Sequence, residues 1–261
     1  MYAASIIIST YNWPEALNLC LLSIRNQTVL PAEVIIADDG SGHETKALVE
    51  RLQLDFPVPL IHIWHEDNGF RKSLILNKSI KRSSGDYIIQ IDGDVITDKH
   101  FIEDHLNTAE RGFFVRGTRA HIKESRLPEI FSKERTDLSF LSAGIINRFN
   151  AIRLPLFAFL AERKRDTSDR VRGSNFAYWK SDFILVNGYN NDLQGWGHED
   201  EELAARFINN MILKKVIKLT AIQFHLSHRQ AARDNESRHG DAVRTTLKKK
   251  LKVCINGYAQ S

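Results

Sequence analysis

The feature that most constrains the fold is an alternation between two periodicities in the first part of the chain. Apolar, β-branched runs occur at 4–9, 33–37, 60–65 and 87–91. Between them lie segments with apolar residues at helical spacing, at 14–26, at 72–83 and in a stretch that ends near residue 54. Strands that alternate with helices form parallel sheets covered on both faces. We therefore expect an α/β fold with a Rossmann-like, mostly parallel sheet and flanking helices.

The second half of the chain is less regular. Strands are predicted at 113–117, 216–219 and 221–224, and a helix at 201–209. The apolar stretch 138–160 contains Arg148, Arg153 and Pro155, which predicts a helical insert or a lid. The charged stretch 230–252 is predicted to be helical. We expect one domain over 1–228, including the helical insert, and a basic helical tail over 229–261.

The composition limits the classes of function. The chain has 261 residues, 43% hydrophobic content and a net charge of +4. A mildly basic chain suits phosphate-bearing ligands or an anionic membrane surface. Its Lys and Arg residues are scattered rather than interleaved with aromatic residues on one element, which argues against nucleic acid as a partner. Cys20 and Cys254 lie in apolar stretches, which favours buried thiols in a reducing compartment over a disulfide.

Two observations bear on location. The N-terminus lacks the basic region of a signal peptide, and no apolar run reaches the roughly 18 residues of a membrane-spanning helix, so we expect a cytoplasmic protein. The stretches 148–165 and 245–253 mix apolar and basic residues. That mixture is typical of a peripheral segment at the inner face of the cell membrane, and it also fits a solvated helix face.

Asp92-Gly93-Asp94 directly follows the predicted strand 87–91. Side chains two residues apart in extended chain point the same way, and glycine between them permits a close approach. Asp92 and Asp94 can therefore face one ligand, and a divalent cation that also binds phosphate needs one or two such carboxylates. An isolated acidic turn is more often merely solvated. Two other polar turns at the same predicted edge of the sheet favour a site for a metal ion and a diphosphate.

These other turns are 9–12 (Ser-Thr-Tyr-Asn) and 38–41 (Asp-Asp-Gly-Ser). An inward-facing carboxylate there can accept the imide hydrogen of a uracil or a ribose hydroxyl, although Asp38 and Ser41 also fit an ordinary helix cap. In the second half, Gly195-Trp196-Gly197 places an aromatic ring before the acidic run 199–202. Such a ring is a common platform for a sugar, although Trp196 also fits a position in the core. The helix dipole alone can explain such a run.

Together, Ile-Ile-Ile-Ser-Thr-Tyr-Asn, Asp-Asp-Gly-Ser and Asp-Gly-Asp resemble the nucleotide-binding half of the inverting, family 2-type glycosyltransferases of GT-A fold. Trp-Gly-His-Glu-Asp at 196–200 resembles the C-terminal motif of the galactosyltransferase and chondroitin-polymerase-like branches. The order and spacing of four motifs over about 4–228 make the resemblance specific. It implies a nucleotide-binding half at 1–97 and an acceptor-binding half at 98–228. His198 departs from the pattern, since the galactosyltransferase branch often has glycine there, and the insert 138–164 has no counterpart.

The resemblance also implies roles for individual residues. Asp94 and His225 bind Mn²⁺ or Mg²⁺, with His228 as a rival to His225. Asp200 is the general base, and Glu199 orients the acceptor. The remaining residues implied for the UDP-sugar are Ser9, Tyr11, Asn12, Asp39, Arg71, Asp92 and Gly93, of which Tyr11 stacks on the base and Asp39 recognises it. Those implied for donor sugar and acceptor are Trp196, Gly173, Ser174 and Asn175.

The implied function is metal-dependent, inverting transfer of a hexose from a UDP-sugar to a glycan or lipid-linked glycan, in surface polysaccharide or lipopolysaccharide synthesis. The hexose is galactose, N-acetylgalactosamine, glucose or glucuronate. The Glu199-Asp200 pair argues against a retaining enzyme. A nucleotidyltransferase needs a glycine-rich phosphate loop after its first strand. Residues 9–12 of this chain, Ser-Thr-Tyr-Asn, contain no glycine, which argues against that class of enzyme. A catalytically inactive subunit that binds a nucleotide or a sugar is the non-enzymatic alternative.

Overall fold

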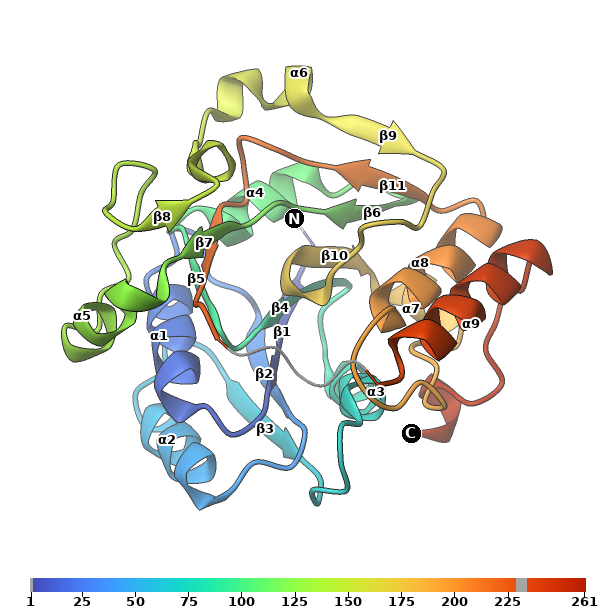
Figure 1. The fold of residues 1–261 in the computed structure, drawn as a ribbon, viewed down its shortest axis with the longest axis horizontal. Helices are drawn as coiled ribbons and strands as arrows, with labels where there is room; N and C mark the ends of the chain where they lie inside the picture. Colours follow the sequence, from blue (N-terminus) through green and yellow to red (C-terminus); the bar gives the residue numbers. More distant parts are fainter. Residues whose placement is uncertain (1, 229–233) are drawn as a thin grey trace.

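The chain is built on one eight-stranded sheet with the order β3-β2-β1-β4-β10-β6-β11-β9. The computed structural model describes residues 2–228 and 234–261 (Figure 1). The first four strands pair in parallel, and they are β1 (Ala4–Thr10), β2 (Glu33–Asp38), β3 (Leu60–Trp64) and β4 (Tyr87–Asp92). This half of the sheet confirms the predicted alternation of strands and helices.

The other half of the sheet is mixed. Strand β10 (Phe176–Trp179) runs antiparallel to both β4 and β6 (Phe113–Arg116). Strand β11 (Leu213–Val216) is parallel to β6, and β9 (Arg163–Arg165) closes the edge antiparallel to β11. Because β10 is antiparallel to both of its neighbours, β6 runs in the same direction as β4. The end of β6 and the start of β10 therefore lie at the same edge as the carboxyl ends of β1–β4.

Helices cover both faces of the sheet. On one face, Ile6 and Ile8 pack in a cluster with Leu17 of α1 (Pro14–Arg25) and Leu48 of α2 (His43–Gln53). On the other face, Ile7 packs with residues of three helices. These helices are α3 (Lys72–Arg82), α7 (Lys180–Leu185) and α8 (Glu199–Asn209). Because both faces are buried, the strands are apolar throughout rather than alternating.

A smaller four-stranded sheet stands beside the large one, with the order β5-β12-β7-β8. Its strands are β5 (Val95–Thr97), β7 (Ala120–Ile122), β8 (Ile145–Ile146) and β12 (Gln223–His225). Strand β12 pairs with β5 and sets His225 opposite Val95. A third apolar cluster lies under this sheet and includes α5 (Leu127–Ser132), which follows the turn η1 (Glu124–Arg126). Helix α4 (Phe101–Thr108) and this sheet were not predicted from the sequence.

The predicted strands 216–219 and 221–224 are displaced in the structure. Strand β11 ends at Val216 and β12 begins only at Gln223. Leu219 and Ala221 have φ angles of 63° and 49°, in the left-handed region that strands do not adopt. The predicted helix 201–209 begins two residues earlier, at Glu199.

Besides the two-residue strand β8, the insert 138–164 contains short helical turns. They are η2 (Arg148–Ala151), η3 (Pro155–Phe157) and α6 (Ala158–Ala161), and β9 follows them. Pro155 starts η3, as suits a residue with a fixed φ and no N–H. Figure 1 shows α6 and β9 along one margin of the molecule.

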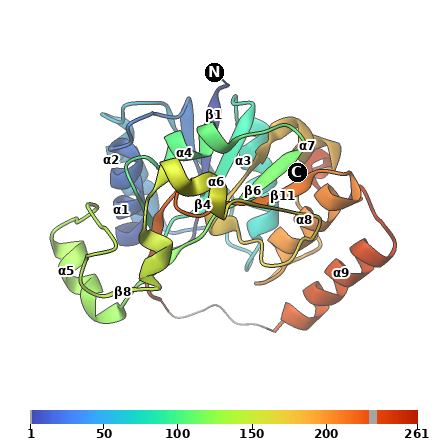
Figure 2. The same cartoon turned by 90° about the horizontal axis from the view of Figure 1, so that it is seen from above.

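The C-terminal part packs against the rest of the chain. Helix α9 (Glu236–Lys248) lies beside α8 (Figure 2), and Thr246 Oγ1 donates to Glu202 Oε1 at 3.0 Å. The turn η5 (Tyr258–Gln260) follows it. Residues 230–233 of the predicted helix lie outside the described residues. Cys20 and Cys254 are buried free thiols. Among the described helices, none combines the length and the apolar character needed to cross a membrane.

Candidate active site

The acidic turn after β4 lies in a polar cluster at the carboxyl edge of the sheet. Asp92 Oδ1 accepts hydrogen bonds from Ser9 Oγ at 2.9 Å and from Lys72 Nζ at 2.7 Å. Gly93 N donates to Ser9 O at 2.8 Å, and a side chain at Gly93 would stand 3.1 Å from that oxygen. The turns after β1 and β4 are therefore joined, as their positions in the sequence predicted.

Lys72, which the sequence analysis did not single out, lies among three carboxylates. Burial alone would lower the pKa of its ammonium group, but Asp92, Asp200 and Glu199 together raise that pKa. Lys72 therefore stays charged and offsets their mutual repulsion. The sequence around Lys72, at the start of α3, does not indicate this role, because the acidic residues that surround it come from distant parts of the sequence.

Asp94, His225 and His228 form a group with the chemistry of a metal site. One ligand atom from each residue lies within 4.8 Å of the others. The Nε2 atoms of His225 and His228 lie 3.3 Å and 2.9 Å from Asp94 Oδ2. Burial opposes ionisation of Asp94, yet hydrogen bonds from the two histidines hold its pKa well below the usual range.

These three residues fit a divalent cation. Asp94 Oδ1 is buried and has no hydrogen-bond partner among the described residues. One carboxylate and two imidazoles suit Mn²⁺ or Zn²⁺ better than Ca²⁺, and they leave coordination positions for phosphate oxygens. His225 and His228, which were alternatives in the sequence, are therefore both placed where they can bind the metal ion.

The residues predicted to hold a nucleotide base lie around the turn after β2. Asp39 accepts hydrogen bonds from His65 Nε2 at 2.7 Å and from Arg71 N at 2.8 Å. Burial raises the pKa of Asp39 in spite of these bonds. The Tyr11 side chain is 52% exposed, and its hydroxyl donates to Asp67 Oδ2 at 2.9 Å. Its ring face is therefore available for stacking, whereas His65 was not foreseen.

Asn12 joins two of the polar turns. Its N–H donates to Ser41 Oγ at 2.8 Å, and its Oδ1 accepts from Gly42 N at 2.9 Å. Asp38 binds His62 and the N–H of Ser41, as expected of a residue that stabilises the turn. The Arg71 guanidinium group donates to Glu66 O in the loop before α3. Asn12, Asp38 and Arg71 thus fix the loops around Asp39.

Asp200 is held from two sides at the start of α8. Tyr189 hydroxyl donates to Oδ1 at 2.7 Å, and Gly173 N donates to Oδ2 at 2.6 Å. A side chain at Gly173 would stand 2.5 Å from Gln90 Nε2 and 2.9 Å from Asp200 Oδ1, so only glycine fits there. Burial raises the pKa of Asp200. The structure thus presents an oriented carboxylate of increased basicity.

Glu199 lies beside Asp200, in the first turn of α8. Burial, with the charge of Asp200, raises the pKa of Glu199 to about 7. Its Oε2 accepts from Gly197 N at 3.0 Å, which ties it to the loop that carries the half-buried Trp196. His198 has φ 63°, and its Nδ1 lies 2.7 Å from Glu201 Oε2. The position where the related branch has glycine therefore keeps a left-handed backbone.

The residues predicted to face the sugars differ in their contacts. The Asn175 amide nitrogen donates to Thr118 O and Ala221 O, and its oxygen lies 3.0 Å from His105 Nε2. These bonds join Asn175 to helix α4 and to two loops, and they use the whole amide. Ser174 Oγ accepts from Arg119 Nη1 at 3.3 Å, in a small pocket of basic character.

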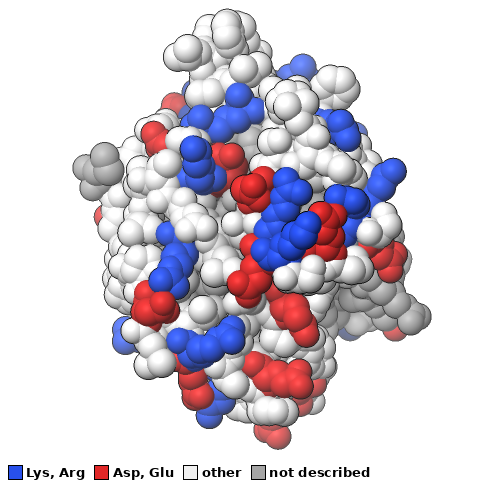
Figure 3. Space-filling view, turned by 90° about the vertical axis from the view of Figure 1, so that its left-hand side faces the viewer, with Lys and Arg blue, Asp and Glu red and all other residues white. Residues whose placement is uncertain are grey.

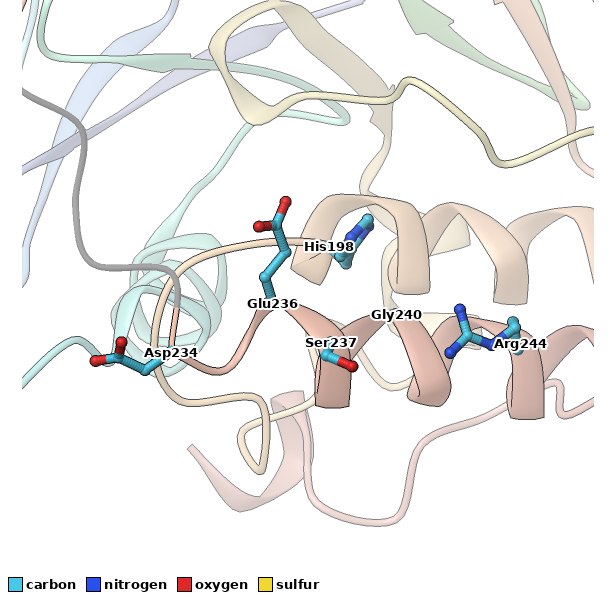
Figure 4. A pocket seen from close by; sticks show the side chains of 6 residues that line it. All are labelled: His198, Asp234, Glu236, Ser237, Gly240 and Arg244. Carbon is cyan, nitrogen blue, oxygen red and sulfur yellow. The ribbon is translucent and has the colours of Figure 1, made fainter.

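A larger cavity of about 420 Å³ lies between the start of α8 and α9. Figure 4 shows its lining side chains, which are His198, Asp234, Glu236, Ser237, Gly240 and Arg244. Neither Asp94 nor Asp200 lines it, and its lining is charged and polar rather than apolar. It adjoins the Trp196 loop and is separate from the cluster around Lys72.

Sequence comparisons agree with the motifs. A profile of glycosyl transferase family 2 matches residues 5–183, and one of the N-terminal domain of galactosyltransferase matches 155–229. Validoxylamine A glucosyltransferase of Streptomyces hygroscopicus subsp. limoneus is 25% identical over 218 residues, which are 77% of this chain and 47% of that protein. Chondroitin synthase of Escherichia coli is 23% identical over 226 residues, 77% of this chain and 32% of that protein. The chain thus spans less than half of these relatives.

Solved structures share the fold. Residues 1–349 of S. aureus TarS, in complex with UDP, have a TM-score of 0.63 at 14% identity, over 98% of this chain and 68% of that one. The mannosyltransferase PcManGT of Pyrobaculum calidifontis, in complex with GDP-Man and Mn²⁺, has a TM-score of 0.58 at 16% identity, over 96% and 63%. The fold is GT-A, as predicted. Since the family 2 profile covers more than half of the sequence, the chain belongs to glycosyl transferase family 2.

Proposed function

We propose that the chain transfers a hexosyl group from a UDP-sugar to a glycan acceptor, with inversion at the anomeric carbon. The observation that carries this proposal is Asp200, a buried and oriented carboxylate that shares one cluster with Lys72 and Asp92. The motif resemblance favours galactose, N-acetylgalactosamine, glucose or glucuronate as the transferred sugar, and surface polysaccharide or lipopolysaccharide as the product.

In the proposed reaction, Asp200 takes the proton of an acceptor hydroxyl as its oxygen bonds to the anomeric carbon. The bond from that carbon to the UDP oxygen breaks, and the electron pair leaves with UDP. Tyr189 and Gly173 fix the orientation of the carboxylate, and its raised pKa increases its basicity. Asp94, His225 and His228 would hold the cation, which supplies positive charge to the leaving diphosphate when bound.

The donor site is proposed over the ends of β1, β2 and β4. Tyr11 would stack on uracil, and Asp39 would accept its imide hydrogen. Solved neighbours with UDP and with GDP-Man and Mn²⁺ support a nucleotide-sugar donor and a metal ion. Relatives that include a chondroitin synthase support a glycan acceptor.

The first experiment is calorimetric titration of UDP with and without Mn²⁺. We expect metal-dependent binding in the wild type and its loss in Asp94→Ala, because that change removes the carboxylate that the two histidines face. Asp98→Ala, directly after β5 and at the end of that strand far from His225, serves as the control and should bind like the wild type. Equal UDP binding by Asp94→Ala would contradict the metal assignment, and no binding by the wild type would overturn the donor class.

Asp200→Asn tests the general base. General-base catalysis contributes about 10²–10⁴-fold, so turnover should fall at least about a hundredfold while UDP binding is retained. Single-turnover transfer and calorimetry on the same preparation measure the two quantities. Wild-type turnover in Asp200→Asn would remove Asp200 from this role, and analysis of the anomeric configuration of the product would decide the stereochemistry.

We also propose peripheral contact with an anionic membrane through the insert. Phe149, Leu156 and Phe159 are 86%, 83% and 71% exposed, and the neighbouring strand β9 is a run of exposed basic residues, Arg163–Arg165. Exposed apolar groups of this size mark binding surfaces. Apolar side chains flanked by basic ones are suited to an interface with anionic lipids.

A further inference from the structure

A small pocket beside the proposed catalytic residues has a strongly basic lining. Three arginines line it together with Ser174 and Gln223, and they are Arg116, Arg119 and Arg172. Arg116 ends β6, Arg119 lies in the loop to β7, and Arg172 precedes η4 (Gly173–Asn175). No carboxylate of the described chain lines this pocket.

The charges of the three arginines are not balanced by ion pairs within the described residues. Arg116 Nε donates to the carbonyl of Arg170 at 3.0 Å, and Arg119 Nη1 donates to Ser174 Oγ at 3.3 Å. Burial and then the charge of Arg172 lower the pKa of both Arg116 and Arg119. Asp169 acts on Arg116, and Asp92 and Asp94 act on Arg119, in the opposite sense but without forming an ion pair. Among the described residues, three like charges thus converge without a carboxylate in direct contact.

Buried polar atoms in the same pocket also lack partners. Gln223 is fully buried, and neither its amide nitrogen nor its amide oxygen has a partner in the described part of the chain. Arg119 Nε is likewise buried without a partner. Leaving such groups unsatisfied is unfavourable, so a ligand with both hydrogen-bond acceptors and donors would stabilise them. An acidic sugar has both, namely an anionic group and hydroxyls.

The position of the pocket indicates which substrate would reach it. Arg172 immediately precedes Gly173, whose N–H binds Asp200. The pocket lies at the end of β6 and the start of β10, on the opposite side of β4 from β1 and β2, which carry Ser9 and Asp39. A group bound there would be close to Asp200, and it would lie on the side of β4 away from Tyr11 and Asp39, while Arg119 is within range of the charges of Asp92 and Asp94.

We propose that this pocket binds the anionic group of an acidic sugar, a carboxylate or a phosphate, on the glycan acceptor. The inference rests on the proposed transferase function, because it assigns the acceptor side of that same site. The anion is bound by Arg116, Arg119 and Arg172. The amide oxygen of Gln223 accepts a hydrogen bond from a neighbouring sugar hydroxyl, and its amide nitrogen donates one to a sugar oxygen. The chain thereby selects acidic over neutral acceptors.

The test uses binding and does not depend on turnover. Glucuronate, glucose 6-phosphate and glucose are titrated by NMR into the wild type with UDP and the diamagnetic Mg²⁺ present. The first two distinguish carboxylate from phosphate. We expect at least one acid to bind and glucose to bind at least about tenfold more weakly, since charge-assisted hydrogen bonds to arginine are lost.

Variants then locate the binding. Arg172→Gln and Arg119→Gln should lower the affinity for the acidic sugar at least about tenfold while the affinity for UDP stays unchanged. Arg170→Gln, a neighbouring exposed arginine outside the pocket, should behave like the wild type. Equal binding of glucose and both acids would overturn the proposal, and so would a loss of UDP affinity in Arg172→Gln, which would assign the pocket to the diphosphate. If the wild type binds the acidic sugar but not UDP, the proposed UDP-sugar donor is wrong and the proposed pocket for an anionic group stands.

Discussion

Glu199 provides the clearest pH-dependent prediction at the scale of one residue. Its carboxyl has a pKa of about 7 in the folded chain, mainly because of burial, against 4.5 for an ordinary glutamate. Its contribution to stability is therefore greatest below pH 4.5 and is lost as the pH rises toward 7. Glu199→Gln removes this loss. Between pH 4.5 and pH 8, the free energy of unfolding of the variant should therefore rise relative to that of the wild type, by on the order of 3 kcal/mol.

Urea unfolding at pH 5 and pH 8 measures that difference. Glu44→Gln, in the exposed first turn of α2, is the matched control and should give the same difference from the wild type at both pH values. If Glu199→Gln behaves like this control, the Glu199 carboxyl titrates as a surface group does.

At the same scale, the sequence predicted the residues whose chemistry is visible in a motif. Asp92, Asp94 and Asp200 could be singled out from the sequence because each lies in a short acidic run after an apolar segment or a glycine-rich turn, and the structure gathers Asp92 and Asp200 around Lys72. Lys72, Tyr189 and His65 were missed because their roles depend on contacts between distant elements. Asn175 was predicted to face sugars, and its amide also joins helix α4 to two loops, which no pattern in one sequence can reveal.

Helix α8 provides a prediction at the scale of one element. Arg206 and Glu202 are 1% and 3% exposed and form an ion pair at 2.7 Å, one turn apart. Arg206 also donates to Val186 O and Gly188 O, which fixes the segment that leads to Tyr189. Arg206→Met leaves a buried carboxylate without its counter-charge. The free energy of unfolding should fall by about 3–5 kcal/mol, as measured by denaturant unfolding.

The control for this pair is an ion pair of the same spacing on the surface. Lys46 and Glu50 on α2 are 68% and 61% exposed, so Lys46→Met should change stability by less than about 1 kcal/mol. The double change of Glu202 and Arg206 to Met should recover part of the loss, since no unpaired charge remains. An equal cost for Arg206→Met and Lys46→Met would show that burial of this pair has no energetic consequence.

Elements were predicted well where a single period continued over many residues. The four parallel strands and α1–α3 follow from apolar runs and helical spacing. The boundaries near 216–224 were wrong because two residues with positive φ interrupt the extended chain. The strands of the small sheet are three residues long or shorter, too short to show a period, and they are stabilised by pairing between distant segments.

At the scale of the whole molecule, apolar and charged surface are unevenly distributed. Figure 3 shows Lys, Arg, Asp and Glu interspersed over most of one face, and a largely uncharged protrusion at the level where Figure 1 places α6. The exposed apolar residues of that segment are Phe149, Leu154, Leu156, Phe157, Phe159 and Leu160. Their exposure is unfavourable in water, which is the physical reason to expect a binding partner there.

Vesicle co-sedimentation tests whether that partner is a membrane. The wild type should bind vesicles with anionic lipid at low salt and be released at high salt, because the attraction of Arg163–Arg165 to the lipid is screened. Leu156→Ser/Phe159→Ser should weaken binding at least about tenfold, since each buried side chain contributes about 1.5–3 kcal/mol. Leu54→Ser, at a residue 87% exposed directly after α2, should have no effect. Dimerisation that the double variant abolishes, without vesicle binding, would instead assign the surface to a second copy of the chain.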